Sequence, residues 1–161
     1  MRMSEGVEWA LHSCLNLTWL PAGQAVPAAK LAAFYDLPAA YLNKQLQALA
    51  RAGIVSSTSG PRGGFQLARD PAAITLLDVV VAIEGADEAF RCEELLKRGP
   101  GADPEVDYRQ ACLLSQAMRR ADLAWRRELA GQTLADLKAQ VERHYPGTPA
   151  STVNRFTALR A

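Results

Sequence analysis

Two short helical patterns followed by a glycine-rich hairpin, all within residues 26–69, constrain the fold of this chain more than any other feature. Apolar residues recur at helical spacing over residues 27–35 and again, after a break at residues 36–38, along one stripe. Asp36 can cap the second helix, and Pro38 suits a first helical turn. The pair of patterns predicts a helix-turn-helix.

The hairpin that follows predicts a wing. Residues 51–53, Arg-Ala-Gly, stop the second helix, and residues 54–57 and 65–67 are typical of two short strands. Between them lies the tip, Gly60-Pro61-Arg62-Gly63-Gly64. The expected fold class is therefore mainly α with a small β wing: a winged helix-turn-helix domain, followed by a long dimerisation helix argued below.

This architecture indicates sequence-specific binding to double-stranded DNA. The N-terminal end of the second helix enters the major groove, and an arginine at the wing tip can reach the minor groove. Lys44 suits a phosphate, and Asn43 and Gln45 carry the paired donor and acceptor that suit adenine. Any one of these residues alone is typical of a solvated surface, so the whole pattern supports the prediction. The candidate DNA contacts are Tyr41, Asn43, Lys44, Gln45, Arg62 and Gly63.

Length and charge limit the alternatives. A chain of 161 residues with 49% hydrophobic composition can form one globular domain plus an oligomerisation element. Residues 1–69 hold six basic side chains against three acidic ones, a net +3, and the remainder hold twelve against fourteen, a net −2. This weak basic excess favours a dimer that grips two half-sites over one strongly basic patch.

The sequence shows neither a signal peptide nor an apolar run near the roughly 20 residues that span a bilayer. We therefore expect a cytoplasmic protein that does not enter a membrane. An odd count of three cysteines argues against a disulfide framework and leaves thiols available for metal or redox chemistry.

The rest of the chain is predicted to be largely helical. Ser4 can cap a helix that runs to about Trp19 with an apolar face, and residues 75–83 and 89–97 are expected to form two shorter helices. Glycines and prolines in residues 98–104 indicate a loop.

From about residue 107 to residue 129, apolar residues recur at steps of four and three, the spacing of a helix that packs along another helix. The recurring residues are Leu114, Met118, Ala121 and Trp125. We interpret this helix as the homodimer interface, with packing inside one chain as the alternative. Residues 146–161 lack periodicity and are expected to be disordered or to lie on the surface.

Four motifs together resemble the Rrf2 family of bacterial winged-helix transcriptional regulators, which includes IscR, NsrR and RsrR. They are Tyr41-Leu42, Arg51-Ala52-Gly53-Ile54-Val55, the wing tip at residues 60–64, and Ile74-Thr75-Leu76-Leu77-Asp78-Val79-Val80. The resemblance covers residues 1 to about 138. It implies a homodimeric regulator that often senses iron, redox state or nitric oxide through an iron–sulfur cluster.

Many cluster-bearing members use three cysteines in this region, whereas this chain has only Cys92 and Cys112, with nineteen residues between them. Glu8 and His12 lie four apart on the first helix, so their side chains project from one face and can meet one metal centre. Two thiolates, an imidazole and a carboxylate suffice for a [2Fe-2S] cluster. This ligand set resembles that of the redox-sensing member RsrR.

The resemblance also implies that the ligands are shared between subunits, with Glu8 and His12 from one chain and both cysteines from its partner. Imidazole ligation raises a cluster's reduction potential, so a one-electron change becomes accessible. Reduction adds charge at the interface, and His12 can change protonation and shift its helix relative to the wing. Trp9 is the redox-switch candidate, with an ordinary interface aromatic as its alternative role.

Other interpretations stay open for the same residues. Glu8 with His12 can be a solvent-facing pair, and either cysteine can be a small buried side chain. The same four ligands can hold zinc, or the cysteines can act as a plain thiol switch in a regulator without a cluster. An enzyme is disfavoured because the chain has no phosphate loop or nucleophile elbow.

The predicted organisation is a winged helix-turn-helix domain over residues 1–85, a cluster-binding helix and loop over 86–106, a dimerisation region over 107–141, and a tail over 142–161. The sequence specifies neither the operator nor the target genes. It also does not specify the signal, which state of the cluster binds DNA, or whether the protein represses or activates transcription.

Overall fold

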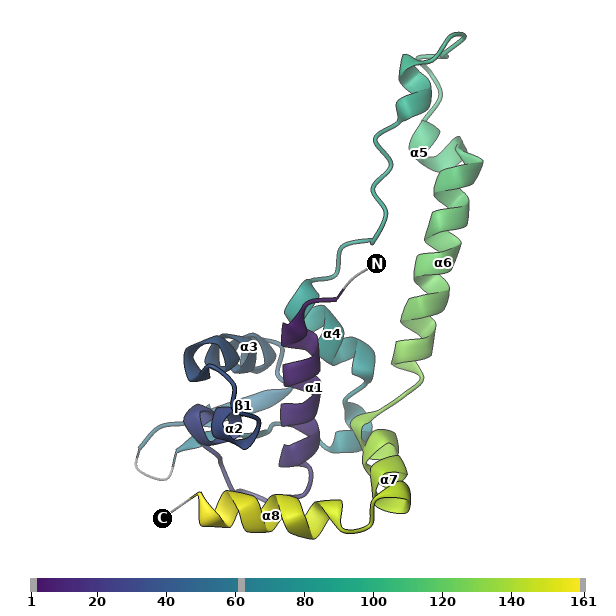
Figure 1. The fold of residues 1–161 in the computed structure, drawn as a ribbon. Helices are drawn as coiled ribbons and strands as arrows, with labels where there is room; N and C mark the ends of the chain where they lie inside the picture. The colour runs from purple at the N-terminus through teal and green to yellow at the C-terminus, as the bar shows by residue number, and fades with distance from the viewer. Residues whose placement is uncertain (1–2, 61–62, 160–161) are drawn as a thin grey trace.

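The computed structural model describes residues 3–60 and 63–159 (Figure 1). Helix α1, Glu5–Leu17, stands at the centre of the folded body, with the helix-turn-helix and wing on one side and α4 on the other. Its inner face carries Val7, Ala10 and Cys14, all buried. These residues follow the 3.6-residue helical period, so one stripe of α1 forms the middle of the hydrophobic core.

Ser4 occupies the N-cap position of α1 as expected, but its side chain makes no capping hydrogen bond. Its hydroxyl and backbone N–H instead donate to Oε1 of Glu84, at 2.6 and 2.9 Å. The predicted capping role of Ser4 is therefore wrong. Ser4 ties the start of α1 to the end of α4, 80 residues further along the chain.

The helix-turn-helix is confirmed, with α2 over Ala28–Phe34 and α3 over Ala39–Arg51. The turn differs in detail from the expectation. Asp36 adopts a left-handed conformation with φ 55° and makes no cap, and Pro38 stands at the N-cap position of α3. A short polar side chain tolerates this conformation better than most, so Asp36 serves the turn and not the helix end.

The wing is also confirmed, as an antiparallel pair of β1, Val55–Thr58, and β2, Gly64–Leu67. A further antiparallel bridge joins Phe65 to Val26 and fastens the wing to the chain before α2. At Gly64, with φ 150°, an added Cβ would lie 2.2 Å from the carbonyl carbon of Val26. Only glycine fits this close approach.

Helix α4, Leu76–Glu84, follows a short 3-10 turn, η1, over Pro71–Ala73. Thr75 and Asp78 form a complete capping box at its start, with hydrogen bonds of 2.9 and 3.0 Å. Helix α4 packs against both α1 and α3. The core between these helices and the wing contains Ala10, Cys14, Leu31, Leu42, Leu46, Leu49, Ile54, Phe65, Ile74 and Val79.

Beyond α4 the chain leaves the body and forms an extended arm (Figure 1). The predicted helix at 89–97 is wrong: residues 86–94 are irregular, and only η2, Leu95–Arg98, forms a 3-10 turn. Leu95 and Leu96 are exposed. Without a buried face these apolar side chains do not stabilise a longer helix within one chain.

The predicted long helix is broken into α5, Tyr108–Ala111, and α6, Leu113–Ala130. Cys112 stands at the break with a non-helical ψ of 117°. The Ser115 hydroxyl and the Gln116 amide donate to the carbonyls of Arg109 and Gln110, at 3.0 and 2.8 Å. Side-chain donors thus replace backbone N–H groups at these carbonyls, which allows the helix to turn.

The tail is helical, contrary to the expectation of an irregular segment. Helix α7, Leu134–His144, leads through a turn into α8, Thr148–Ala158. Phe156 of α8 is 1% exposed and stacks on Phe34 of α2, with ring centroids 4.8 Å apart. The sequence pattern gave no sign of this helix because the aromatic partner lies on α2. Tertiary packing therefore decides the structure of the tail.

We expect Phe156→Ala to lower the free energy of unfolding by about 3–5 kcal/mol, the range for truncating a buried phenylalanine. Urea denaturation measures the change, and Asn154→Ala, at an exposed position of the same helix, is the control. An unchanged midpoint for Phe156→Ala would show that α8 does not belong to the folded core.

Candidate DNA-binding and metal-binding sites

The outer face of α3 presents three of the predicted DNA contacts. Asn43 and Lys44 are exposed, and Tyr41 is 50% exposed at the N-terminal end of the helix. Their neighbours Leu42 and Leu46 are fully buried. The helix thus has one core face and one solvent face, and the solvent face carries an amide, an ammonium and a phenol.

Gln45 does not belong to that solvent face, contrary to its predicted DNA contact. Its side chain is only 8% exposed and lies against Gly6 of α1. A Cβ added at Gly6 would lie 2.8 Å from the amide nitrogen of Gln45. Residue 45 lies one turn from the buried Leu49 and directly before Leu46, so the helical period places it toward α1.

At the wing tip, the predicted contact Arg62 lies outside the described residues. Gly63 is half-buried, and its N–H donates to the carbonyl of Gly60 at 2.8 Å. A Cβ at Gly63 would come within 2.3 Å of the Thr58 carbonyl oxygen. The structure therefore gives Gly63 a clear role in the shape of the hairpin.

An aromatic contact joins α1 to the recognition helix. The rings of Trp9 and Tyr41 meet edge to face, with centroids 5.4 Å apart and planes at 75°. This is a favourable geometry for two aromatic rings. Trp9 follows Glu8, a candidate metal ligand, directly along α1. The Trp9 ring in turn contacts Tyr41, a candidate DNA contact, so one side-chain contact separates the two candidate sites.

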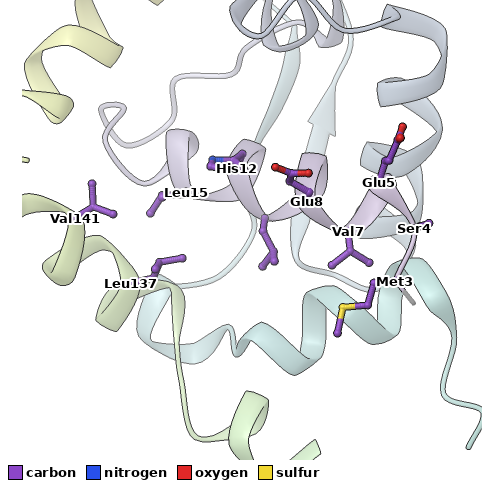
Figure 2. A pocket seen from close by; sticks show the side chains of 10 residues that line it. Met3, Ser4, Glu5, Val7, Glu8, His12, Leu15, Leu137 and Val141 are labelled. Atoms are coloured by element: carbon purple, nitrogen blue, oxygen red, sulfur yellow. The ribbon is translucent and has the colours of Figure 1, made fainter. Parts of the chain in front are cut away.

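Glu8 and His12 are exposed and lie on the same side of α1, as their spacing predicts (Figure 2). They border a groove of about 570 Å³ between α1 and α7. Its apolar lining comprises Met3, Val7, Leu11, Leu15, Leu137 and Val141, and its polar edge includes Ser4, Glu5, Glu8 and His12. A carboxylate and an imidazole thus stand at the rim of an apolar groove.

His12 also touches the helix-turn-helix. Its ring lies 5.5 Å from that of Tyr35, which ends α2, and the Tyr35 hydroxyl accepts a hydrogen bond of 3.1 Å from Asn16. Burial raises the pKa of the Tyr35 phenol, a rise that the Asn16 hydrogen bond and Arg155 partly offset. Tyr35 therefore acts as a neutral hydrogen-bonding group beside His12.

Cys92 and Cys112 are half-buried free thiols on the arm. Cys92 lies two residues before Glu94, and Cys112 lies three residues after Arg109. The Glu94 carboxylate pairs with Arg109 at 3.3 Å and with Lys97 at 2.9 Å. The Glu94–Arg109 pair joins the two segments that carry the thiols.

Cys14 behaves differently from the other two cysteines. It is fully buried in the core, and this burial raises the pKa of its thiol to about 12. A thiol in that environment is neither a ready metal ligand nor a redox group.

Across residues 3–60 and 63–159, no three or more histidine, cysteine or acidic side chains come together as a metal site within one chain. Glu8 and His12 share one face of α1, and the cysteines share the arm, but the chain does not assemble all four.

Comparison with known proteins identifies the family. Residues 3–140 match the Rrf2 family, described as an iron-dependent transcriptional regulator. The chain belongs to the Rrf2 family.

Among relatives, this Rrf2 chain is 28% identical to YffB of Lactococcus lactis over 145 residues, which is 90% of this chain and 92% of that protein. It is 37% identical over 108 residues to the protein aau3 of Rhizobium meliloti, covering 67% and 66%. These matches place most of its length within the family.

Solved structures agree on the fold. The IscR structure of T. potens superposes with a TM-score of 0.66 at 20% identity, covering 90% of this chain and 91% of that one. The structure of CymR, the global cysteine regulator of B. subtilis, superposes with a TM-score of 0.63 at 21% identity, covering 87% and 98%. The mainly helical fold with a two-stranded wing is thus the Rrf2 fold.

The Rrf2 chain is accordingly a DNA-binding transcriptional regulator and not an enzyme. No helix in its described part is long and apolar enough to cross a membrane. The family also leaves room for a metal cofactor, since its description is iron-dependent.

The sequence did not predict the roles of two polar residues of this Rrf2 chain, Glu84 and Arg126. Glu84 receives both hydrogen bonds from Ser4, and Arg126 of α6 donates to the carbonyls of Ala86 and Asp87 at 3.1 and 2.7 Å. An acid four residues before Arg126, Asp122, was a visible signal for a helical pair. The carbonyl groups that Arg126 contacts lie about 40 residues earlier in the chain, so no local sequence pattern indicates these hydrogen bonds.

We expect Glu84→Gln to destabilise the protein at neutral pH by on the order of 0.5 kcal/mol, a low value because solvent competes at this exposed site. The Ser4 hydroxyl and N–H hold the pKa of Glu84 below its ordinary 4.5. The carboxylate's contribution is therefore full above that value and is lost as pH falls through the lowered pKa.

Urea denaturation of wild type and Glu84→Gln across this pH range measures the effect. The gap between the two proteins should close in acid. Ser4→Ala on the Glu84→Gln background should add little, because the two residues share one interaction. A gap that is constant with pH would contradict the role of the Glu84 charge.

Proposed function

We propose that this Rrf2 regulator is a cytoplasmic homodimer whose affinity for its operator is set by the redox state of a [2Fe-2S] cluster held by Glu8, His12, Cys92 and Cys112. The observation that carries the proposal is the contact of α1 with both helices of the helix-turn-helix. Trp9, beside Glu8, touches Tyr41 of α3, and His12 itself lies against Tyr35 of α2. A change at these ligands is therefore one contact away from the DNA-binding surface.

The donor set fits such a cluster. Two thiolates, one imidazole and one carboxylate provide four ligands, and all four side chains are at least partly accessible. The finer resemblance, to the redox-sensing member RsrR, rests on this set and on residues 7–12 of α1. When bound, the cluster would supply a one-electron couple, with a potential raised by imidazole ligation.

Exposed apolar surface on α6 supports a homodimer. Ser115 is the one buried residue of this helix among those described, while Leu113 and Leu114 are 78% and 64% exposed. Met118 and Leu123 of this helix are exposed as well. Solvent-facing leucines of this kind favour burial against a partner.

The groove beside α1 suggests where the partner packs. It is apolar along its length and has Glu8 and His12 at its rim. A second copy's α6 lying in this groove would bring Cys112, the residue directly before that helix, toward those ligands. Glu8 and His12 from one subunit and the cysteines from the other then complete one site at the interface.

We assign DNA recognition to three exposed residues of α3, Tyr41, Asn43 and Lys44. Lys44 contacts a phosphate, Asn43 reads a base edge, and Tyr41 packs at the groove while held by Trp9. Gln45 is withdrawn from this set because it packs on Gly6. The minor-groove contact of Arg62 stays a prediction from the sequence, and Gly63 shapes the described part of the hairpin.

We expect Lys44→Ala to weaken binding to all DNA sequences alike and to reduce the slope of log affinity against log salt by about 1. Asn43→Ala should cost about 1–3 kcal/mol on the preferred operator and relax the preference at one position. Fluorescence anisotropy over a salt series measures both. Gln47→Ala, exposed further along α3, is the control and should bind as wild type.

The shared site can be tested by mixing two ligand variants. Homodimers of His12→Ala or of Cys92→Ala should hold no cluster after anaerobic reconstitution. In a heterodimer of the two variants, one of the two shared sites lacks both His12 and Cys92. The other site keeps all four ligands. Heterodimers isolated through two affinity tags should therefore regain about half of the wild-type iron, sulfide and visible absorbance.

If each site belonged to one chain, the heterodimer would stay colourless. Cys14→Ala removes a thiol that is buried in the core, so it is the matched control and should keep the full cluster. Redox control is tested on the same preparations. Equal operator affinity of oxidised and reduced protein would overturn it.

A second candidate is a zinc site or a thiol switch in place of the cluster. The accessibility of Cys92 and Cys112, against the burial of Cys14, favours it, because accessible thiols bind metals or oxidise readily. A colourless protein with zinc and no sulfide would favour zinc. Operator binding that depends on thiol oxidation, without metal, would favour the switch.

A further inference from the structure

We propose that Arg126 and Asp122 of α6 are positioning residues that hold the Cys92 segment of the arm against the same helix that begins at Cys112. The inference rests on the proposed function, in which both thiols bind one metal cluster. It adds two residues that bind no metal themselves and act through the backbone of residues 86–89.

The contacts form a two-sided clamp. The Arg126 guanidinium donates from Nε to Oδ2 of Asp122 at 2.7 Å, and from one terminal nitrogen to the carbonyls of Ala86 and Asp87 at 3.1 and 2.7 Å. The other oxygen of Asp122, Oδ1, accepts from the backbone N–H of Ala89 at 3.5 Å. Both side chains thus grip the first residues of the arm.

The two side chains of the clamp are partly shielded from solvent, while their hydrogen bonds to the backbone of residues 86–89 are exposed. The side chains of Asp122 and Arg126 are 10% and 21% exposed, and the guanidinium lies 5.7 Å from the centre of the Trp125 ring. Charge-assisted hydrogen bonds of this kind are stronger than neutral ones, and partial burial limits competition from water. The planar guanidinium reaches three acceptors at once, which a lysine ammonium on its single stem does not reproduce.

A second pair across the same two segments provides a natural comparison. Arg119 of α6 faces Glu88 at 3.7 Å, and both side chains are largely exposed, at 42% and 56%. Exposed ion pairs of this length contribute little to stability. The two arginines therefore share a helix and a target segment but differ in burial and hydrogen bonding.

The clamp matters because the arm has no other regular structure at this point. Residues 86–94 belong to no helix or strand, so no backbone ladder fixes their path. Cys92 lies three residues beyond Ala89, a reach of at most about 10 Å. Fixing residues 86–89 on α6 therefore restricts where the Cys92 thiol can go relative to Cys112.

The test compares cluster retention in full-length Arg126→Ala, Arg126→Lys and Arg119→Ala after reconstitution. With an iron chelator present, we expect Arg126→Ala to lose its visible absorbance about tenfold faster than wild type, which corresponds to about 1.4 kcal/mol. Its visible circular dichroism should also change, because the thiol geometry changes. Arg119→Ala should match wild type in both measurements.

Arg126→Lys keeps the positive charge and most of the side-chain packing, so it tests the hydrogen bonds even if Arg126→Ala fails to fold. It should also release the cluster faster than wild type. Limited trypsin digestion of cluster-free protein gives an independent readout, since Arg91 is exposed on the arm. Cleavage after Arg91 should be faster in both Arg126 variants than in wild type or Arg119→Ala.

The outcomes separate the two proposals. A wild-type protein that binds no iron and sulfide defeats the proposed function, while the trypsin comparison still decides whether Arg126 holds the arm. A wild-type cluster that Arg126→Ala and Arg126→Lys retain with the same rate and spectrum overturns the positioning role.

Discussion

The packing of α1 between α3 and α4 is the contact on which the rest of the structure depends. One close contact in this packing is at Gly6, where an added Cβ would lie 2.8 Å from the amide nitrogen of Gln45. This close approach brings the recognition helix directly onto α1. The buried stripe of α1 thereby sets the position of the helix-turn-helix, and its exposed stripe carries Glu8 and His12. One helix serves both the DNA-binding core and the candidate metal site.

The predictions that succeeded depend on local chemistry. The helical stripes of α2 and α3, the glycine-rich wing and the short helix predicted over residues 75–83 are each specified by residues within a few positions of one another. Glu8 and His12 share a face of α1 for the same reason, since the helical period alone places them there. Such features are visible in a sequence because their partners are close along the chain.

The predictions that failed depend on partners far along the chain. Ser4 has the composition of a cap, but Glu84 offers its hydroxyl a stronger, charged acceptor 80 residues away. Gln45 has the chemistry of a base-reading residue, but Gly6 leaves a space that its amide fills. The start of the irregular segment, at Ala86 and Asp87, is held by Arg126, and no periodicity in the sequence reveals these carbonyl partners. In each case a tertiary contact outweighed the local preference.

Helix α8 lies beyond the part of the chain that matches the family. The family match ends at residue 140, yet Phe156 completes the packing around Phe34, and the Arg155 guanidinium lies 4.9 Å from the centre of the Phe34 ring. Helix α2 is thus held by α3 on one side and by α8 on the other. Tyr41, near the N-terminal end of α3, is half exposed, and its ring rests on Trp9. On the proposed function, a change at the ligands of α1 therefore reaches DNA through the Trp9–Tyr41 contact at the start of the recognition helix.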